Sequence, residues 1–109
     1  MQKLLIAALV LTPALAWPAE LELSTACNPC QVDKKLAIHA RVTEGGDPVS
    51  GALVKVSVAT NGTVLTRSTK PTNATGNAQV FVIPHMTGAV AACAVSDTGA
   101  VATIEFAVE

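Results

Sequence analysis

The residues best suited to chemistry are three cysteines. Cys27-Asn28-Pro29-Cys30 forms a C-x-x-C motif, and Cys93 stands alone near the other end of the chain. A C-x-x-C pair works in thiol redox chemistry when its first cysteine begins a helix, because the helix N-terminus lowers the pKa of that thiol. No helical period follows Cys30, so the motif favours a structural disulfide over a redox centre.

The sequence leaves the disulfide pairing open. Three cysteines cannot all pair within one chain. Cys27 and Cys30 would close a tight loop, whereas a bond from either of them to Cys93 would join distant segments. The distant bond would constrain the unfolded chain by about 4 kcal/mol, which is more than the short loop would give. The cysteine left over is a candidate for an intermolecular disulfide.

The histidines do not complete a recognisable site. His39 is expected to face solvent from a strand, and His85 follows Pro84 in a loop beside Met86. Neither zinc spacing nor blue-copper spacing connects these residues to the cysteines. A nucleophile elbow and a glycine-rich phosphate loop are also missing from the sequence. We therefore predict no catalytic residues, no metal, no cofactor and no enzymatic activity.

The N-terminal residues predict export. Lys3 precedes an apolar run from Leu4 to Leu11, and Ala14-Leu15-Ala16 matches the small-x-small pattern of signal-peptide cleavage. We therefore predict a signal peptide over residues 1–16, with a cut after Ala19 as the alternative. The apolar run is far shorter than the roughly 18 residues that span a bilayer, so we expect no membrane span in the mature chain. The expected location is the periplasm, the cell surface or the medium, where disulfides form.

Composition argues against nucleic-acid binding. The formal net charge is −1, tyrosine is absent and only 3% of the residues are aromatic. A nucleic-acid surface needs a positive field and usually rings on which bases can stack. After residue 20 the chain is long enough for one domain.

Apolar residues alternate at period two in short runs, which indicates strands. The clearest run places alternate residues between Leu36 and Val42 on one face. Turn signals separate the runs at Glu44–Pro48, Asn61-Gly62 and Pro71–Gly76. Seven short strands in one domain favour two antiparallel sheets packed face to face, with a small closed barrel as the alternative.

Two stretches resemble the bacterial immunoglobulin-like domains of invasin and intimin adhesins and the carboxypeptidase-regulatory-like modules. Residues 47–56, DPVSGALVKV, are similar to their G-x-P-V-x-G-A-x-V-x-V stretch, and residues 72–78, TNATGNA, are similar to their T-D-x-x-G-x-A loop. Gly88-Ala89-Val90 resembles a strand opening, and residues 102–108 resemble the closing strand. The resemblance implies a seven-stranded immunoglobulin-like β-sandwich over residues 20–109, with a role in cell adhesion.

Two late strands are apolar on both faces. When alternate residues of 78–82 and 90–94 face the core, Phe81, Ile83, Cys93 and Val95 point outward. Strands at a protein interface show this pattern, although a β-bulge or scattered exposed apolar residues would also produce it. We therefore predict a candidate interface at these four residues.

The sequence predicts an exported binding or assembly module without catalytic activity. Its partner would be another exported or cell-surface protein, or a second copy of the chain. The alternative is a periplasmic thiol-redox or metal-handling protein that uses Cys27 and Cys30.

Overall fold

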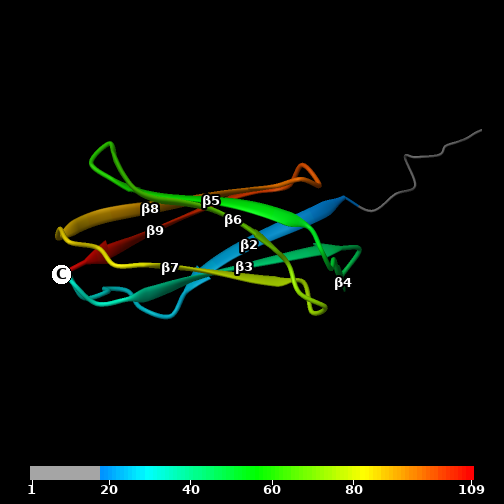
Figure 1. The fold of residues 1–109 in the computed structure, drawn as a ribbon, viewed down its shortest axis with the longest axis horizontal. Coiled ribbons are helices and arrows are strands. Elements are labelled where there is room, and N and C mark those ends of the chain that lie inside the picture. The colour runs from blue at the N-terminus through cyan, green and yellow to red at the C-terminus, as the bar shows by residue number, and fades with distance from the viewer. Residues whose placement is uncertain (1–17) are drawn as a thin grey trace, which may run out of the picture.

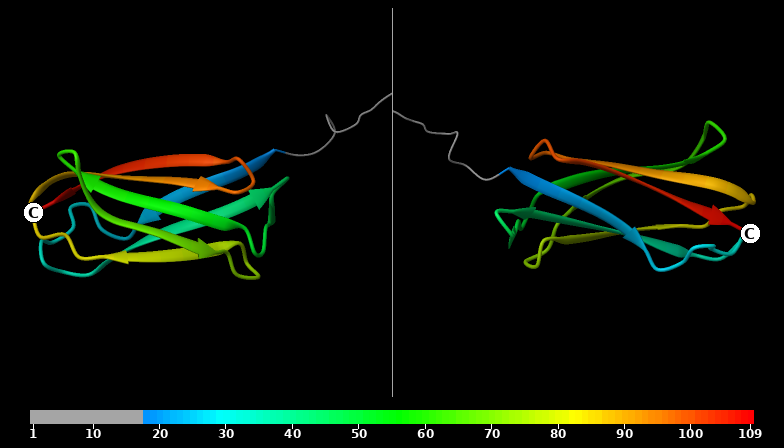
Figure 2. Two further views of the ribbon diagram at one scale, coloured as in Figure 1. Left: turned by 45° about the horizontal axis from the view of Figure 1, so that its top comes forward. Right: turned by 180° about the vertical axis from the view of Figure 1, so that it is seen from behind.

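The computed structural model describes residues 18–109, and every regular element among them is a strand. The predicted signal peptide lies outside the described residues. Two sheets pack face to face, as Figure 1 shows along the sandwich and Figure 2 shows from two further sides. The strands are β2 (Ala19–Thr25), β3 (Leu36–Glu44), β4 (Asp47–Pro48), β5 (Leu53–Thr60), β6 (Thr63–Pro71), β7 (Asn77–Val82), β8 (Gly88–Ser96) and β9 (Val101–Val108). No helix among residues 18–109 is long and apolar enough to cross a membrane.

All paired strands are antiparallel. In the first sheet β3 pairs with β2, with β7 and with the short β4. In the second sheet the order is β6-β5-β8-β9. Two antiparallel sheets with connections that cross between them form an immunoglobulin-like sandwich. The predicted fold class is confirmed, and the barrel alternative is wrong.

The strand count differs from the prediction by one. The sequence predicts a turn over Glu44–Pro48, but Asp47 and Pro48 form the two-residue β4 and pair with Glu44 and Thr43. Gly45 and Gly46 have φ of 60° and 88°, so the chain reverses within two residues and continues the ladder. Such a short strand adds no alternation to the sequence, which is why the pattern does not show it.

The core is built from small and β-branched side chains. Ile38, Val42, Val54 and Val58 are each fully buried, as the alternation predicts. Phe106, 5% exposed, is the buried aromatic ring among residues 18–109. Branched side chains pack well on pleated surfaces, so the two sheets meet without large rings.

The predicted Asn61-Gly62 hairpin is confirmed. Both residues have positive φ, 49° and 79°, as a type I′ turn requires. The turn joins β5 to β6, and a register shift lies between Val58 and Ala59 just before it.

The loop of the second family-like stretch, residues 72–78, packs against β3. The Gly76 carbonyl accepts a hydrogen bond from the Val42 amide at 2.8 Å, and a Cβ on Gly76 would lie 2.7 Å from the Val42 oxygen. The Asn73 side chain accepts hydrogen bonds from the amides of Thr75 and Asn77, both at 3.0 Å. The glycine is therefore required by close backbone approach, and the asparagine caps its own loop.

The loop after β2 holds the end of the chain. The Cys30 amide donates to the Ala107 carbonyl at 2.8 Å, and the Glu109 amide donates to the Cys30 carbonyl at 2.8 Å. The Val32 amide donates to the Glu109 carbonyl at 2.9 Å. Cys30 and Val108 form a parallel bridge, so the loop, which contains a cis Asn28–Pro29 peptide, extends the second sheet beyond β9.

Candidate functional site

The disulfide joins Cys27 to Cys30, with an S–S distance of 2.01 Å. Cys30 is buried in the core, and Cys93 is free and exposed on β8. Ala92 and Ala94, which flank Cys93, are fully buried, so the Cys93 side chain points away from the core. A bond from Cys93 to either of the other cysteines is therefore wrong, because the sheet of β8 lies between them.

The disulfide lies in a loop and not at the start of a helix. Cys27 and Cys30 lie in the loop between β2 and β3, and no helix begins there. The field of a helix N-terminus, which lowers thiol pKa in redox C-x-x-C motifs, is thus missing from this loop. The geometry instead links the disulfide to the backbone hydrogen bonds that hold β9.

The histidines lie apart on the surface. His39 is exposed on β3 beside the Gln79 amide, as the alternation predicts. His85 Nδ1 lies 2.8 Å from Asp33 Oδ1, and both side chains are mostly exposed. Within residues 18–109 no three His, Cys, Asp or Glu side chains gather closely enough to hold a metal ion together.

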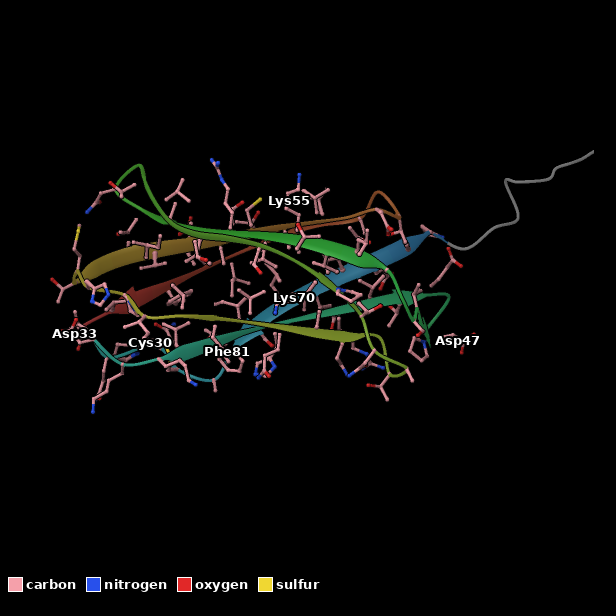
Figure 3. All side chains as sticks on the ribbon, in the orientation of Figure 1. Cys30, Asp33, Asp47, Lys55, Lys70 and Phe81 are labelled. Carbon is pink, nitrogen blue, oxygen red and sulfur yellow. A yellow bond between two sulfur atoms is a disulfide. The ribbon has the colours of Figure 1, made fainter. Side chains whose placement is uncertain are left out.

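The four predicted interface residues are all on the surface, but the structure separates them into two pairs. Phe81 and Ile83 lie on the β7 side of the first sheet, whereas Cys93 and Val95 lie on the outer side of β8 in the second sheet. In Figure 3, Phe81 and Lys55, the cross-strand partner of Val95, point to opposite sides of the sandwich. The two pairs therefore cannot form one continuous surface.

The β7 pair lies beside a shallow groove between the edges of the two sheets. Phe81 is 51% exposed, and Lys35 Nζ lies 4.9 Å from the centre of its ring. Leu65 on β6 and His85 complete the groove beside Ile83. The Lys35 ammonium covers part of the ring in a cation–π contact, which reduces the free apolar surface here.

The β8 pair belongs to a larger surface, which we name the broad face: the outer side of β6, β5, β8 and β9. Cys93 lies near its centre, between Ser57 on β5 and Thr103 on β9. Along β8 its outward neighbours are Ala91 and Val95. The Thr103 hydroxyl donates to the Cys93 sulfur at 3.8 Å. Small side chains therefore surround this thiol on three sides.

Exposed apolar residues gather at one end of the broad face. Leu53, Val95 and Val101 are 48%, 46% and 62% exposed. Val95 is the cross-strand partner of Val101, and the Asp97 amide donates to the Leu53 carbonyl at 2.9 Å. Leu53 and Val95 both line a shallow hollow of about 390 Å³. Apolar side chains grouped in this way are typical of a surface that another protein covers.

Three charged residues lie near Cys93 on the broad face, and one of them, the exposed Arg67 on β6, is the cross-strand partner of Ser57. Lys55 is the cross-strand partner of Val95, and Glu105 is the partner of Ala91. Among residues 18–109 the only ion pair is that of His85 and Asp33, so neither Lys55 nor Glu105 has an opposite charge within 4 Å. Sequence reasoning missed Leu53, Val101, Lys55 and Glu105, because alternation gives the face of a strand but not which strands are neighbours.

Solved structures share this fold. A C-terminal fragment of intimin, solved in complex with the intimin-binding domain of the translocated intimin receptor, matches 80% of this chain with 22% identity and a TM-score of 0.66. The chain spans only 32% of that fragment. A CARDB domain from Pyrococcus furiosus matches 84% of this chain and 94% of its own length, with 19% identity and a TM-score of 0.59. A superoxide reductase from Ignicoccus hospitalis matches 83% of this chain at 17% identity and a TM-score of 0.54.

No protein-family model matches the chain, and no curated protein sequence matches it. The structural matches described above are below 25% identity and establish the fold, which is that of the bacterial immunoglobulin-like domains. The expectation drawn from residues 47–56 and 72–78 is thereby confirmed for the fold. This sandwich carries different functions in different proteins, so the function must be argued from the surface.

Proposed function

We propose that the chain is an exported, non-catalytic protein-binding module that uses the broad face to contact another protein outside the cytoplasm. The observation that carries the proposal is the group formed by Leu53, Val95 and Val101. All three are large apolar side chains with about half or more of their surface in water. Exposed apolar residues scattered singly need no explanation, but a contiguous group on a flat sheet does.

The broad face is favoured over the β7 side for two reasons. The broad face offers a four-stranded surface, whereas β7 is the edge strand of its sheet and presents Phe81 next to Lys35. The centre of the broad face also consists of small residues such as Ser57, Ala91 and Thr103, which let a partner approach closely. A flat surface with an apolar group and small central residues fits a protein partner better than a small molecule.

The comparisons support a binding role without fixing the partner. The intimin fragment, of which this chain spans 32%, was solved in complex with the intimin-binding domain of its receptor, so that protein has a protein partner. The predicted signal peptide and the Cys27–Cys30 disulfide support a location outside the cytoplasm.

The proposal is tested by photo-crosslinking in cells that export the full chain. A benzophenone amino acid is placed at Val95 on the broad face, at Phe81 on β7, or at Glu22 on the outer side of β2 as the control. We expect a covalent protein adduct from position 95 that exceeds the adduct from position 22 at least fivefold. Equal labelling at positions 95 and 22 would contradict the proposal. A dominant adduct at position 81 would assign binding to the β7 groove instead of the broad face.

A further inference from the structure

We infer that the partner of the broad face is a second copy of this chain, related to the first by a two-fold axis that passes beside Cys93. This inference rests on the proposed function, because it names the occupant of the same surface. A two-fold interface uses one patch on both copies, so the patch must complement itself. The broad face meets this condition in the placement of Lys55 and Glu105 and in its shape.

Lys55 and Glu105 are placed symmetrically about Cys93, whereas Arg67 on the edge strand β6 lies outside this pair. Lys55 lies on the neighbouring strand β5 at the level of Val95, two residues beyond Cys93. Glu105 lies on the other neighbouring strand, β9, at the level of Ala91, two residues before Cys93. With strands about 4.8 Å apart and a rise of about 3.4 Å per residue, each charge lies roughly 8 Å from Cys93 in opposite directions.

This placement selects one arrangement of the two copies. When two sheets meet face to face, the two-fold axis can lie in the plane of the interface. Each residue then lies opposite the position that is equally far from the axis on its other side in the second copy. An axis through Cys93, perpendicular to the line from Lys55 to Glu105, places each Lys55 over Glu105 of the second copy. The same strand spacings make the strands of the two copies cross at roughly 70°, near the orthogonal class of sheet packing. Two equivalent ion pairs then form around the central cysteines.

The shape around Cys93 suits this axis. Both residues across from it, Ser57 and Thr103, are small, and so is Ala91 along the strand. Two crossing sheets approach most closely at their crossing point, which is where the side chains are smallest. The two Cys93 thiols therefore face each other across the axis.

The area of the face predicts a weak interface unless the thiols join. Four strands and six residues give a face of roughly 400 Å² per copy, or about 800 Å² in total. Stable complexes usually bury about 1,200 Å² or more, so the association by itself would be weak. With a disulfide such as oxidised glutathione as the oxidant, two Cys93 thiols lose two protons and two electrons and form one bond, while the oxidant is reduced to two thiols.

Charge reversal tests the inference. Lys55→Glu and Glu105→Lys each replace two attractive pairs with two repulsive ones, whereas the double variant restores attraction with the signs exchanged. The control is Lys70→Glu, which makes the same charge change at an exposed position on the side of β6 away from the broad face. The readouts, on the exported protein, are sedimentation velocity with reductant and the initial rate of Cys93–Cys93 dimer formation with oxidised glutathione.

We expect each single reversal to lower the dimerisation rate about tenfold, the double variant to restore it to within twofold, and the control to leave it unchanged. The effect of the single reversals should shrink at 0.5 M salt because exposed ion pairs are screened. Equal rates for all variants, or no recovery in the double variant, would overturn the inference. Since the two single variants reverse opposite halves of the same pairs, either one carries the test when the other is unstable.

The crosslinking experiment separates this inference from the proposed function. An adduct at position 95 with a different protein, together with equal rates for the charge variants, rejects the second copy and retains the binding role. When position 95 gives no adduct and the rates are equal, both are rejected. An adduct of twice the chain mass that weakens in the single reversals and returns in the double variant supports both.

Discussion

The Thr72 hydroxyl donates a hydrogen bond to the Val49 carbonyl at 2.6 Å, and it also accepts one from the Ala52 amide at 2.9 Å. Thr72 is 5% exposed, so water does not replace these bonds. We predict that Thr72→Val lowers the free energy of unfolding by about 2–4 kcal/mol, because the change keeps the shape and leaves a buried donor and acceptor unpaired. Urea unfolding followed by circular dichroism measures the change.

Thr72→Ser is the matched control for this prediction. Serine keeps the hydroxyl and removes one methyl group, so we expect a loss of about 1 kcal/mol. Equal losses for the two variants would show that the methyl group, and not the hydroxyl, stabilises this loop.

Alanine substitutions at Gly62 and Gly76 distinguish the cost of a left-handed backbone from the cost of a close contact. Both glycines have φ of +79°, but a Cβ on Gly62 meets nothing within 4 Å, whereas one on Gly76 lies 2.7 Å from the Val42 carbonyl oxygen. We predict that Gly62→Ala costs about 1–2 kcal/mol of stability from the left-handed backbone alone. Gly76→Ala should cost at least about 2 kcal/mol more, because the backbone of β3 must move. Thermal unfolding of the two variants side by side tests this, and equal melting temperatures would contradict it.

The strands β3 and β5 and the loop around Gly76 show which features of this fold can be predicted from the sequence. Alternation identifies the core face of β3 and β5, and the Asn-Gly dipeptide identifies the hairpin, because these features depend on neighbouring residues. The contact of Gly76 with Val42 and Pro48 joins segments that are far apart in the sequence. Such contacts depend on strand order, which composition and periodicity do not encode. The turn signals and the family resemblance both predicted a loop here, but neither predicted its contact with β3.

Phe106 and Phe81 allow a buried ring to be compared with an exposed one. Phe106 is 5% exposed and packs in a core of Val, Ala, Ile and Leu side chains, whereas Phe81 is 51% exposed. We predict that Phe106→Ala lowers the free energy of unfolding by about 3–5 kcal/mol. Phe81→Ala should lower it by about 1 kcal/mol or less, since it loses mainly the Lys35 contact. A larger effect at Phe81 would mean that this ring belongs to the core.

The number of free thiols in the native protein tests the disulfide pairing. The native protein should react with one equivalent of a thiol reagent, at Cys93, and Cys93→Ser should remove that reaction. We predict that Cys27→Ala/Cys30→Ala costs about 2–3 kcal/mol, because the short disulfide loop constrains the unfolded chain by about 2 kcal/mol and Cys30 is buried. Mass spectrometry and urea unfolding measure these quantities.

The same cysteines test the thiol-redox alternative. With dithiothreitol as the reductant, the protein should not accelerate insulin reduction, since no helix begins at the loop that holds Cys27 and Cys30. Acceleration that disappears in Cys27→Ala/Cys30→Ala would support the redox alternative and contradict a purely structural disulfide.

The candidate site was only partly predictable. Alternation within β7 and β8 correctly placed Phe81 and Val95 outward. It also placed both residues in one interface, which is wrong because β7 and β8 belong to different sheets. The alternation of a single strand does not reveal which sheet that strand joins. The neighbours that define the broad face, Lys55 on β5 and Glu105 on β9, follow from the register of β5, β8 and β9, and β5 is separated from β8 by two other strands in the chain. Register over such separations is decided by how the two sheets close over the core, not by local sequence.

The hydrogen bonds between Cys30 and the end of β9 have a mechanical consequence. The start of β2 and the C-terminal residue lie at opposite ends of the sandwich (Figure 1), and the segment around Cys30 runs parallel to the last residues of β9. Tension applied between the two ends would slide these segments past each other. Their hydrogen bonds would then resist the pull together instead of opening one after another, and the disulfide limits how far the loop can extend. The sandwich should therefore resist extension along its long axis.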